Sequence, residues 1–398
     1  MTVIAGTLAR AARPLPPVDL ALPALGLLDS ELLTKALRAT LPPRHEVESA
    51  RVRYLEYRPQ LRLLMHADVL VDGTRRDASL RAGTAATPVR AATGHKVPWV
   101  ESVVHWMPSD PDLPLLAATR PELCTLLAQA GARSPAADEP ALLAYVPSRR
   151  AVLRIGDCVL KTYARVEDFR RSAAALALVG DGLDLPTPRF VAAVPELRTT
   201  VQEAVDGLAA APDAAVDLAP SAGLILRRLH RSDRQAATVM TPHAQLAVAA
   251  DAVTLLGSVV PEQRDRARAL LRHLHATAPS DVPLVLSHGD FNIGQLLTTA
   301  QGTVVTDVDM VCRAPAAYDL ASYAANLVSG RPGDELRAEA ALEALLSTYG
   351  DVPALRWHLA TALLRRCDRP FRRAKRRWIE HCTTVLDIAE RVSESWGE

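Results

Sequence analysis

The sequence of 398 residues predicts an α+β protein with a small β-rich lobe followed by a larger helical lobe. Two stretches, 46–82 and 145–205, contain short runs of alternating apolar and polar residues, which is typical of strands. From residue 206 onward, apolar residues recur every three to four positions, which is typical of amphipathic helices. Only 284–309 departs from this, because short strands and tight turns interrupt the helical region there.

Length and composition exclude several classes of protein. The chain is too long for a single compact core, and its 49 % apolar residues suffice for two or three sub-domains. A net charge of +1 argues against a nucleic-acid binder that relies on bulk charge. No apolar stretch reaches the roughly 18–20 residues of a membrane span, and the N-terminus does not resemble a signal peptide. Five scattered cysteines without a CxxC pair indicate free thiols, so we expect a cytoplasmic protein.

The first 140 residues are expected to form an extra N-terminal cap domain of mixed α and β structure. Helical spacing over 27–41 begins at a plausible cap, Asp29 or Ser30. An antiparallel meander follows over 46–82, and 120–131 reads as a short helix.

A second meander of similar design is indicated by a repeated pattern. "YRPQLRLLM" at 57–65 resembles "YVPSRRAVLRI" at 145–155, with a Tyr, a Pro and an Arg at matching positions. Such a match predicts two related hairpins, and coincidence in an Arg- and Leu-rich chain is the alternative.

The stretch 145–205 is expected to run strand, strand, helix, strand, strand. The Gly156-Asp157 turn favours a hairpin, and the helix spans 166–180. Lys161 lies in the strand-like run "CVLKTY" and is one of only four lysines. Because arginine supplies nearly all other positive charge, a lysine here suggests a need for a compact amine.

Four residues could together serve phosphoryl transfer. That chemistry needs a carboxylate at the acceptor hydroxyl, oxygen ligands for Mg²⁺ and a fixed cation on the non-transferred phosphates. Lys161, Asp290, Gln295 and Asp307 supply these groups, and the interval between the last two suits a β-hairpin.

The motif "HGDFNIGQLL … VVTDVDMVCRAPAAYDLA" resembles the aminoglycoside phosphotransferase and choline kinase group of protein kinase-like enzymes. The likeness covers roughly 145–385. It implies a two-lobed protein kinase-like fold, with an N-lobe over 141–205 and a helical C-lobe over 206–398. The extra N-terminal domain, 1–140, is similar in architecture to the cap of maltokinase-type sugar kinases.

The resemblance also implies a role for each matching residue, with ATP and Mg²⁺ as cofactors. Asp290 would be the catalytic base. Nucleotide binding would involve Lys161 at the phosphates and the main chain of Gln202, Glu203 and Ala204 at the adenine. Gln295 and Asp307 would hold the metal, and the supporting residues would be His288, Asp309 and Asp319.

Three departures from the family pattern affect these expectations. Gln295 stands where the family has Asn, so its amide oxygen lies one methylene further out. The helix after Lys161 holds Ser172, Ala174 and Ala175 where an acidic partner for the lysine is expected. Arg149 and Arg150 stand in place of a Gly-rich loop, either as phosphate contacts or as a solvated pair.

The predicted function is an ATP- and Mg²⁺-dependent O-phosphotransferase acting on a small-molecule hydroxyl, such as that of an aminoglycoside or a sugar. One alternative is a kinase for peptide Ser/Thr hydroxyls in modified-peptide (lanthipeptide-type) biosynthesis. Another is a pseudokinase that binds nucleotide or a partner without turnover, which the missing lysine partner suggests. The basic run 365–377 reads as a solvated helix face, or else as a site for an acidic substrate or a partner protein. We expect no nucleic-acid and no membrane partner.

Overall fold

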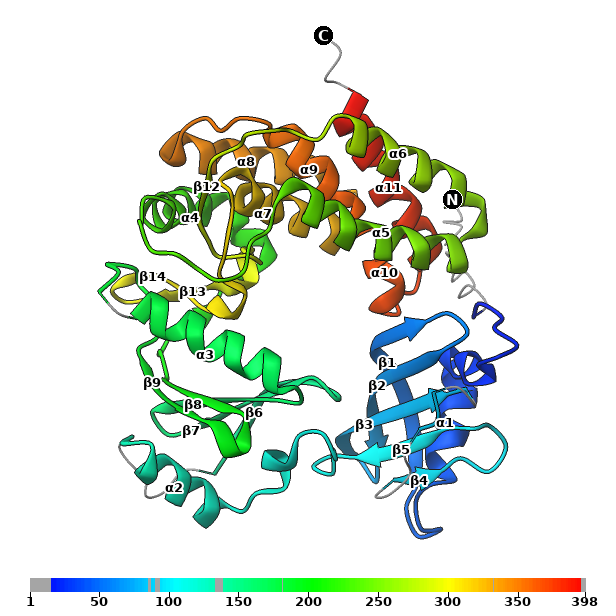
Figure 1. Ribbon diagram of the computed structural model, residues 1–398. Helices are drawn as coiled ribbons and strands as arrows, with labels where there is room; N and C mark the ends of the chain where they lie inside the picture. Colours follow the sequence, from blue (N-terminus) through cyan, green and yellow to red (C-terminus); the bar gives the residue numbers. More distant parts are fainter. Residues whose placement is uncertain are drawn as a thin grey trace, which may run out of the picture.

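The computed structural model describes residues 16–84, 87–89, 94–132, 139–180, 182–331 and 333–394. The stretch 1–15, which was considered for a signal peptide, lies outside them. Figure 1 shows three parts, namely a helical lobe and two separate β-sheets below it, one on each side. Across the described ranges, no helix combines the length and apolar character needed to cross a membrane.

The N-terminal sheet has five antiparallel strands in the order β1-β2-β3-β5-β4. Helix α1 (Ser30–Arg38) packs on β1 and is capped by Asp29, whose side chain accepts from two helix N–H groups. The predicted helix and meander are therefore confirmed, whereas the last two strands were not expected from their short sequences. The strands are β1 (Val47–Arg58), β2 (Arg62–Val71), β3 (Thr74–Gly83), β4 (His95–Lys96) and β5 (Val103–Trp106).

The second sheet has the same strand order, β6-β7-β8-β10-β9, and is also antiparallel. Its helix α3 (Val166–Gly180) has the predicted bounds. The sheet is preceded by α2 (Arg120–Gln129), as expected. Its strands are β6 (Ala141–Val146), β7 (Arg150–Ile155), β8 (Cys158–Tyr163), β9 (Phe190–Val194) and β10 (Thr199–Glu203).

The repeated sequence pattern corresponds to two equivalent hairpins, one in each sheet. The register pairs Arg58 with Arg62 in the first and Val146 with Arg150 in the second, so each turn spans three residues. An aspartate from another segment binds each hairpin, accepting hydrogen bonds of 2.7–2.9 Å from a tyrosine hydroxyl and from the N–H of a turn residue with positive φ. In the first hairpin Asp19 accepts from Tyr57 and Gln60. In the second Asp110 accepts from Tyr145 and Ser148. The predicted relation between the two meanders is confirmed.

Asp110 also joins the two sheets. Besides the second turn it binds Arg81 of β3, whose Nη2 donates to Asp110 Oδ1 at 2.7 Å. The Asp110 side chain is fully buried, whereas Asp112, the other partner of Arg81, is 45 % exposed. One buried carboxylate therefore holds the turn before β7 in a fixed relation to the N-terminal sheet.

We expect Asp110→Ala to lower the stability of the protein by about 3–5 kcal/mol, because the substitution leaves Arg81 partly buried without its buried partner. Asp112→Ala serves as the matched control and is expected to cost at most about 1 kcal/mol, since that pair is open to solvent. Thermal and urea unfolding of the two variants measure the difference. Equal losses would show that Asp110 does not hold the sheets together.

The helical lobe contains eight helices among the described residues, together with five short strands. The helices are α4 (Ala215–His230), α5 (Pro242–Val259), α6 (Arg264–Ala276), α7 (Ala317–Gly330), α8 (Glu335–Tyr349), α9 (Leu355–Leu364), α10 (Arg369–Arg372) and α11 (Trp378–Glu394). The strands are β11 (Leu208–Ala209), β12 (Leu284–Ser287), β13 (Leu296–Thr299), β14 (Gly302–Val305) and β15 (Cys312–Pro315).

The N-terminal sheet packs directly on this helical lobe. A single apolar cluster contains buried side chains from both, and β1 contacts α10 (Figure 1). The rings of Tyr57 and Phe371 meet edge to face with their centroids 6.2 Å apart. The N-terminal part of the chain therefore contacts both the second sheet, through Asp110, and the C-terminal region of the helical lobe, through Phe371.

Candidate active site

The loop after β12 is anchored by one buried carboxylate, Asp319 of α7. Its two oxygens accept the main-chain N–H groups of His288 and Gly289 at 2.6 and 3.0 Å. Burial acts to raise the pKa of Asp319, but the hydrogen bond and charge of His230 outweigh it, and the pKa lies below its usual range. His230 at the end of α4 therefore belongs to the support of this loop.

A glycine with a left-handed backbone sets the direction of the loop. Gly289 has φ +88°, and a Cβ placed on it would lie 2.0 Å from the main-chain oxygen of Met310. Only glycine fits such a close approach. The next residue, Asp290, consequently leaves the buried loop and points its half-exposed carboxylate outward, with 51 % of the side chain accessible.

The hairpin formed by β13 and β14 returns Asp307 beside Gln295. The Thr306 N–H donates to the Gln295 carbonyl at 2.8 Å, and His288 Nε2 contacts the Thr306 carbonyl at 3.0 Å. Gln295 Nε2 donates to Asp307 Oδ2 at 3.3 Å, so the amide nitrogen, and not the oxygen, faces this carboxylate. Asp307 itself has left-handed angles, φ 59° and ψ 45°, which aspartate tolerates better than most residues.

Two cations from the second sheet converge on Asp307. Lys161 Nζ pairs with Asp307 and also with Asp309, and its side chain is only 8 % exposed. Arg150 lies 3.4 Å from Asp307 and 3.8 Å from Asp309. Burial acts to raise the pKa of Asp307, but the charges of Lys161 and Arg150 hold it well below its usual range. Arg150 is thus part of the site, and its interpretation as a solvated arginine is wrong.

The acidic partner of Lys161 comes from an unexpected segment. Asp309 lies in the short helix η7 (Val308–Met310), two residues after Asp307. Ser172 of α3 donates to Asp309 Oδ1 at 3.0 Å, and the Tyr163 hydroxyl donates to Oδ2 at 2.8 Å. The serine at the helix position where a carboxylate was expected therefore holds the carboxylate that Lys161 uses. The Asp-x-Asp spacing in "TDVD" was the available sequence signal.

The predicted adenine-binding main chain lies at the end of β10. Gln202 and Glu203 pair with β8 in the sheet. The N–H groups of Glu203 and Ala204 donate to the carbonyls of Arg189 and Asp157, at 2.9 and 2.8 Å. Because these two N–H groups already donate hydrogen bonds within the lobe, they are not free to bind an adenine. Other main-chain atoms of the linker after β10 would have to make that contact.

The donor set fits a metal held jointly with phosphate groups. Mg²⁺ prefers oxygen ligands and is usually bound by one or two carboxylates together with substrate phosphates. Asp307 and the amide of Gln295, after a half-turn of that amide, provide such a pair. The oxygens of Asp309 already accept from Tyr163 and Ser172, and the described residues contain no cluster of three His, Cys, Asp or Glu that could hold a metal alone.

The basic run 365–377 lies beside Asp290 and is not a solvated helix face. Arg366 is buried, and its Nη2 lies 3.8 Å from Asp290 Oδ1. Phe371 in the same run packs in the core. The expectation of a solvated face is wrong because the helix is interrupted between the end of α9 and the start of α10, and part of the run lies buried there.

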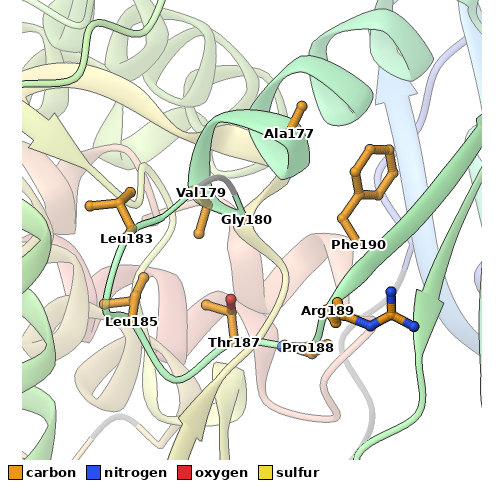
Figure 2. A pocket seen from close by; sticks show the side chains of 9 residues that line it. All are labelled: Ala177, Val179, Gly180, Leu183, Leu185, Thr187, Pro188, Arg189 and Phe190. Atoms are coloured by element: carbon orange, nitrogen blue, oxygen red, sulfur yellow. The ribbon is translucent and has the colours of Figure 1, made fainter.

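Two hollows lie away from this cluster, and their lining contains none of the predicted site residues. Figure 2 shows one of about 390 Å³, formed by the C-terminal end of α3 and the segment 183–190. Another, of about 510 Å³, lies between α6, α9 and α11.

Comparisons with known proteins identify the family and the fold. A family model described as the phosphotransferase enzyme family (APH) matches residues 142–358. No curated protein sequence matches the chain. Among solved structures, choline kinase LicA from Streptococcus pneumoniae is similar with a TM-score of 0.50 and 13 % identity, covering 68 % of this chain and 98 % of that one.

Two further structures are similar over most of their own length. A choline/ethanolamine kinase family protein from Mesorhizobium loti has 16 % identity and a TM-score of 0.49, covering 68 % of this chain and 94 % of that one. An aminoglycoside phosphotransferase from Streptomyces rimosus, in complex with ADP and streptomycin, has 20 % identity and a TM-score of 0.46, covering 61 % and 97 %.

Proposed function

The chain belongs to the phosphotransferase enzyme family and has a two-lobed protein kinase-like fold, and on that premise we propose that it transfers the γ-phosphoryl group of ATP to a small-molecule hydroxyl. One observation carries the proposal. Lys161, Asp307 and Asp309 form one buried ion cluster beside the loop that presents Asp290. These are the groups that phosphoryl transfer requires at the donor and acceptor ends.

Each residue of the cluster has a role that follows from its surroundings. Asp290, half-exposed on an anchored loop, accepts or orients the proton of the acceptor hydroxyl. Lys161 and Arg150 bind phosphate oxygens, and Asp309, tied to α3 through Ser172, holds the lysine in place. Mg²⁺ bound by oxygens of Asp307 and Gln295 would neutralise charge on the phosphates.

The nucleotide would lie between the second sheet and the helical lobe. Since the N–H groups of Glu203 and Ala204 bond within the N-lobe, we place the adenine against the following linker, 204–207. Gln202 and Glu203 then act by fixing the start of that linker through strand pairing.

Each alternative function was suggested by a specific feature. The amide nitrogen of Gln295, which faces Asp307 in place of the oxygen, fits the pseudokinase alternative. A pseudokinase was suggested by a missing acidic partner for Lys161, and Asp309 is such a partner. A peptide or protein partner was suggested by an exposed basic face on 365–377, and part of that run is buried beside Asp290. We therefore propose a small-molecule acceptor, with aminoglycosides and sugar-like alcohols as the classes to assay.

The direct test is acceptor-dependent release of ADP in the presence of Mg²⁺ and ATP. We expect release with an alcohol acceptor, and a fall of at least about 100-fold in Asp307→Asn, because that variant loses charge at the phosphates. ATP binding is followed separately by thermal shift. Failure of the wild type to bind ATP would contradict the proposal, and tight binding without turnover on any acceptor would favour a pseudokinase.

A further inference from the structure

A group of arginines surrounds the acceptor side of Asp290. Arg366 is 7 % exposed, and its guanidinium is fixed by two donated hydrogen bonds, from Nη1 to the Ala362 carbonyl at 3.1 Å and from Nη2 to Ser322 Oγ at 2.7 Å. Its Nη2 also lies 3.8 Å from Asp290 Oδ1. The positive charge closest to the proposed catalytic base is therefore held in position before any substrate arrives.

The neighbouring arginines have neutral partners. Arg365 donates to the Tyr318 hydroxyl and lies over its ring, 5.2 Å from the centroid. Arg369 Nη1 donates to Ser329 Oγ at 3.4 Å. In the parts of the chain that the structure describes, no ion pair involves Arg365, Arg369 or Arg373, and the nearby carboxylate of Asp368 is bound to Arg372.

The positive charges of this group are consequently under-compensated. Burial lowers the pKa of Arg366 to about 9, and the adjacent Arg365 contributes to the shift. Burial likewise lowers the pKa of Arg369 to about 10, with a contribution from Arg373, and Asp290 opposes both shifts. Asp290, which catalysis itself needs, and Asp368, which is bound to Arg372, are the carboxylates that act on these guanidinium groups among the described residues.

The N-terminal sheet adds to the same charge. Packing of Tyr57 on Phe371 brings β1 against α10. Burial lowers the pKa of Lys375, and nearby arginines, among them Arg51 of β1, lower it further. Positive charge therefore borders the acceptor side both on the helical lobe and on the N-terminal sheet.

We infer that the acceptor is an alcohol that also carries a phosphate or carboxylate group, which Arg366 and Arg369, together with the exposed Arg373, bind while its hydroxyl meets Asp290. This inference rests on the proposed phosphotransferase function and narrows its substrate class. Guanidinium groups match the geometry of carboxylate and phosphate oxygens, and an anion would compensate charges that are costly to bury alone. Cationic acceptors such as aminoglycosides and choline would be repelled.

The reaction balances with this acceptor. The acceptor oxygen forms a bond to the γ-phosphorus of ATP while the bond from that phosphorus to the β,γ-bridging oxygen breaks. The hydroxyl proton passes to Asp290 and then to solvent, and ADP and a phosphate ester leave.

Matched acceptors that differ in charge provide the test. We compare glucose with glucose 6-phosphate and glycerol with glycerate, and include streptomycin and choline as cations. The anionic member of at least one pair is expected to have a kcat/KM about tenfold or more above its neutral partner, as a charged hydrogen bond would give. The two pairs separate phosphate from carboxylate recognition.

Arg369→Gln and Arg373→Gln are expected to raise the KM for the anionic acceptor about tenfold or more, with the KM for ATP unchanged. Arg377→Gln is the matched control, since Arg377 is 61 % exposed and paired with Glu380, and it should change neither constant. Equal or better use of the neutral or cationic acceptors, with no effect of either variant, would overturn the inference.

A binding measurement separates this inference from the proposed function. Calorimetric titration with inorganic phosphate, at saturating ADP, should detect an anion site in the wild type that Arg369→Gln and Arg373→Gln weaken. Such a result supports the anion site even if no acceptor is turned over. Phosphate binding that is absent, or equal in all variants, overturns it, whereas failure to bind ATP contradicts only the phosphotransferase proposal.

Discussion

Asp290→Asn is expected to lower turnover by about 10²–10⁴-fold, which is the usual contribution of a positioned acid–base group. The side chain is half-exposed, and the loop is held by the main-chain N–H groups of His288 and Gly289 on Asp319, so the fold should persist. ATP binding should also be kept, because Asp290 faces the acceptor side. Steady-state ADP release, thermal unfolding and ATP titration measure the three quantities.

Asp184→Asn provides the control for that substitution, since the Asp184 side chain is fully exposed and pairs with Arg228 of α4, not with the loop. It should leave turnover unchanged. If Asp290→Asn retained full activity with the same acceptor, the carboxylate would not be the base, and the alignment of this loop with kinase catalytic loops would be structural only.

Lys161→Met is expected to cost about 3–5 kcal/mol of stability and to weaken nucleotide binding strongly. The substitution leaves Asp307 and Asp309 largely buried with only Arg150 nearby, and a buried charge without its partner is costly. Lys96→Met, at an exposed position, is the matched control and should have little effect. Thermal and urea unfolding, together with ATP titration, measure both consequences.

The pH dependence of the stability of Lys161→Met shows whether lost charge pairing or lost packing causes the destabilisation. In the wild type, the depressed pKa of Asp307 means that its stabilising effect is present at neutral pH and is lost only as the pH falls through that low value. Without Lys161 the pKa of Asp307 should rise, because burial then meets less opposing positive charge, and protonating Asp307 on acidification stabilises the folded state. The stability gap between wild type and variant should therefore narrow from pH 7 to pH 4. A constant gap would show that lost packing, and not charge, explains the effect.

Local patterns were sufficient to predict most of the framework. The bounds of α3 and the two meanders follow from periodicity within single segments and from turn residues such as Gly156. Strands β4, β5, β11 and β15 were missed because a pairing of two to four residues leaves no pattern and depends on a distant partner.

The residues of the site likewise fall into two groups. Some belong to a contiguous motif, and others come together only through tertiary contacts. The motif around Asp290 and Asp307 is contiguous, so its residues could be named from the sequence. The pairing of Lys161 with Asp309 and Ser172 joins three separate segments, and only the fold brings them together. The buried position of Arg366 likewise depends on the break between α9 and α10, which a single amphipathic helix over 365–377 would not contain.

Phosphorus NMR of the complete reaction tests the central claim most directly. Wild-type protein, ATP, Mg²⁺ and an alcohol acceptor should produce ADP and one new phosphate ester in equal amounts, and Asp290→Asn should produce neither at a comparable rate. ADP accompanied only by inorganic phosphate, or ester formation that persists unchanged in the variant, would contradict the assignment of this cluster as a phosphotransferase site.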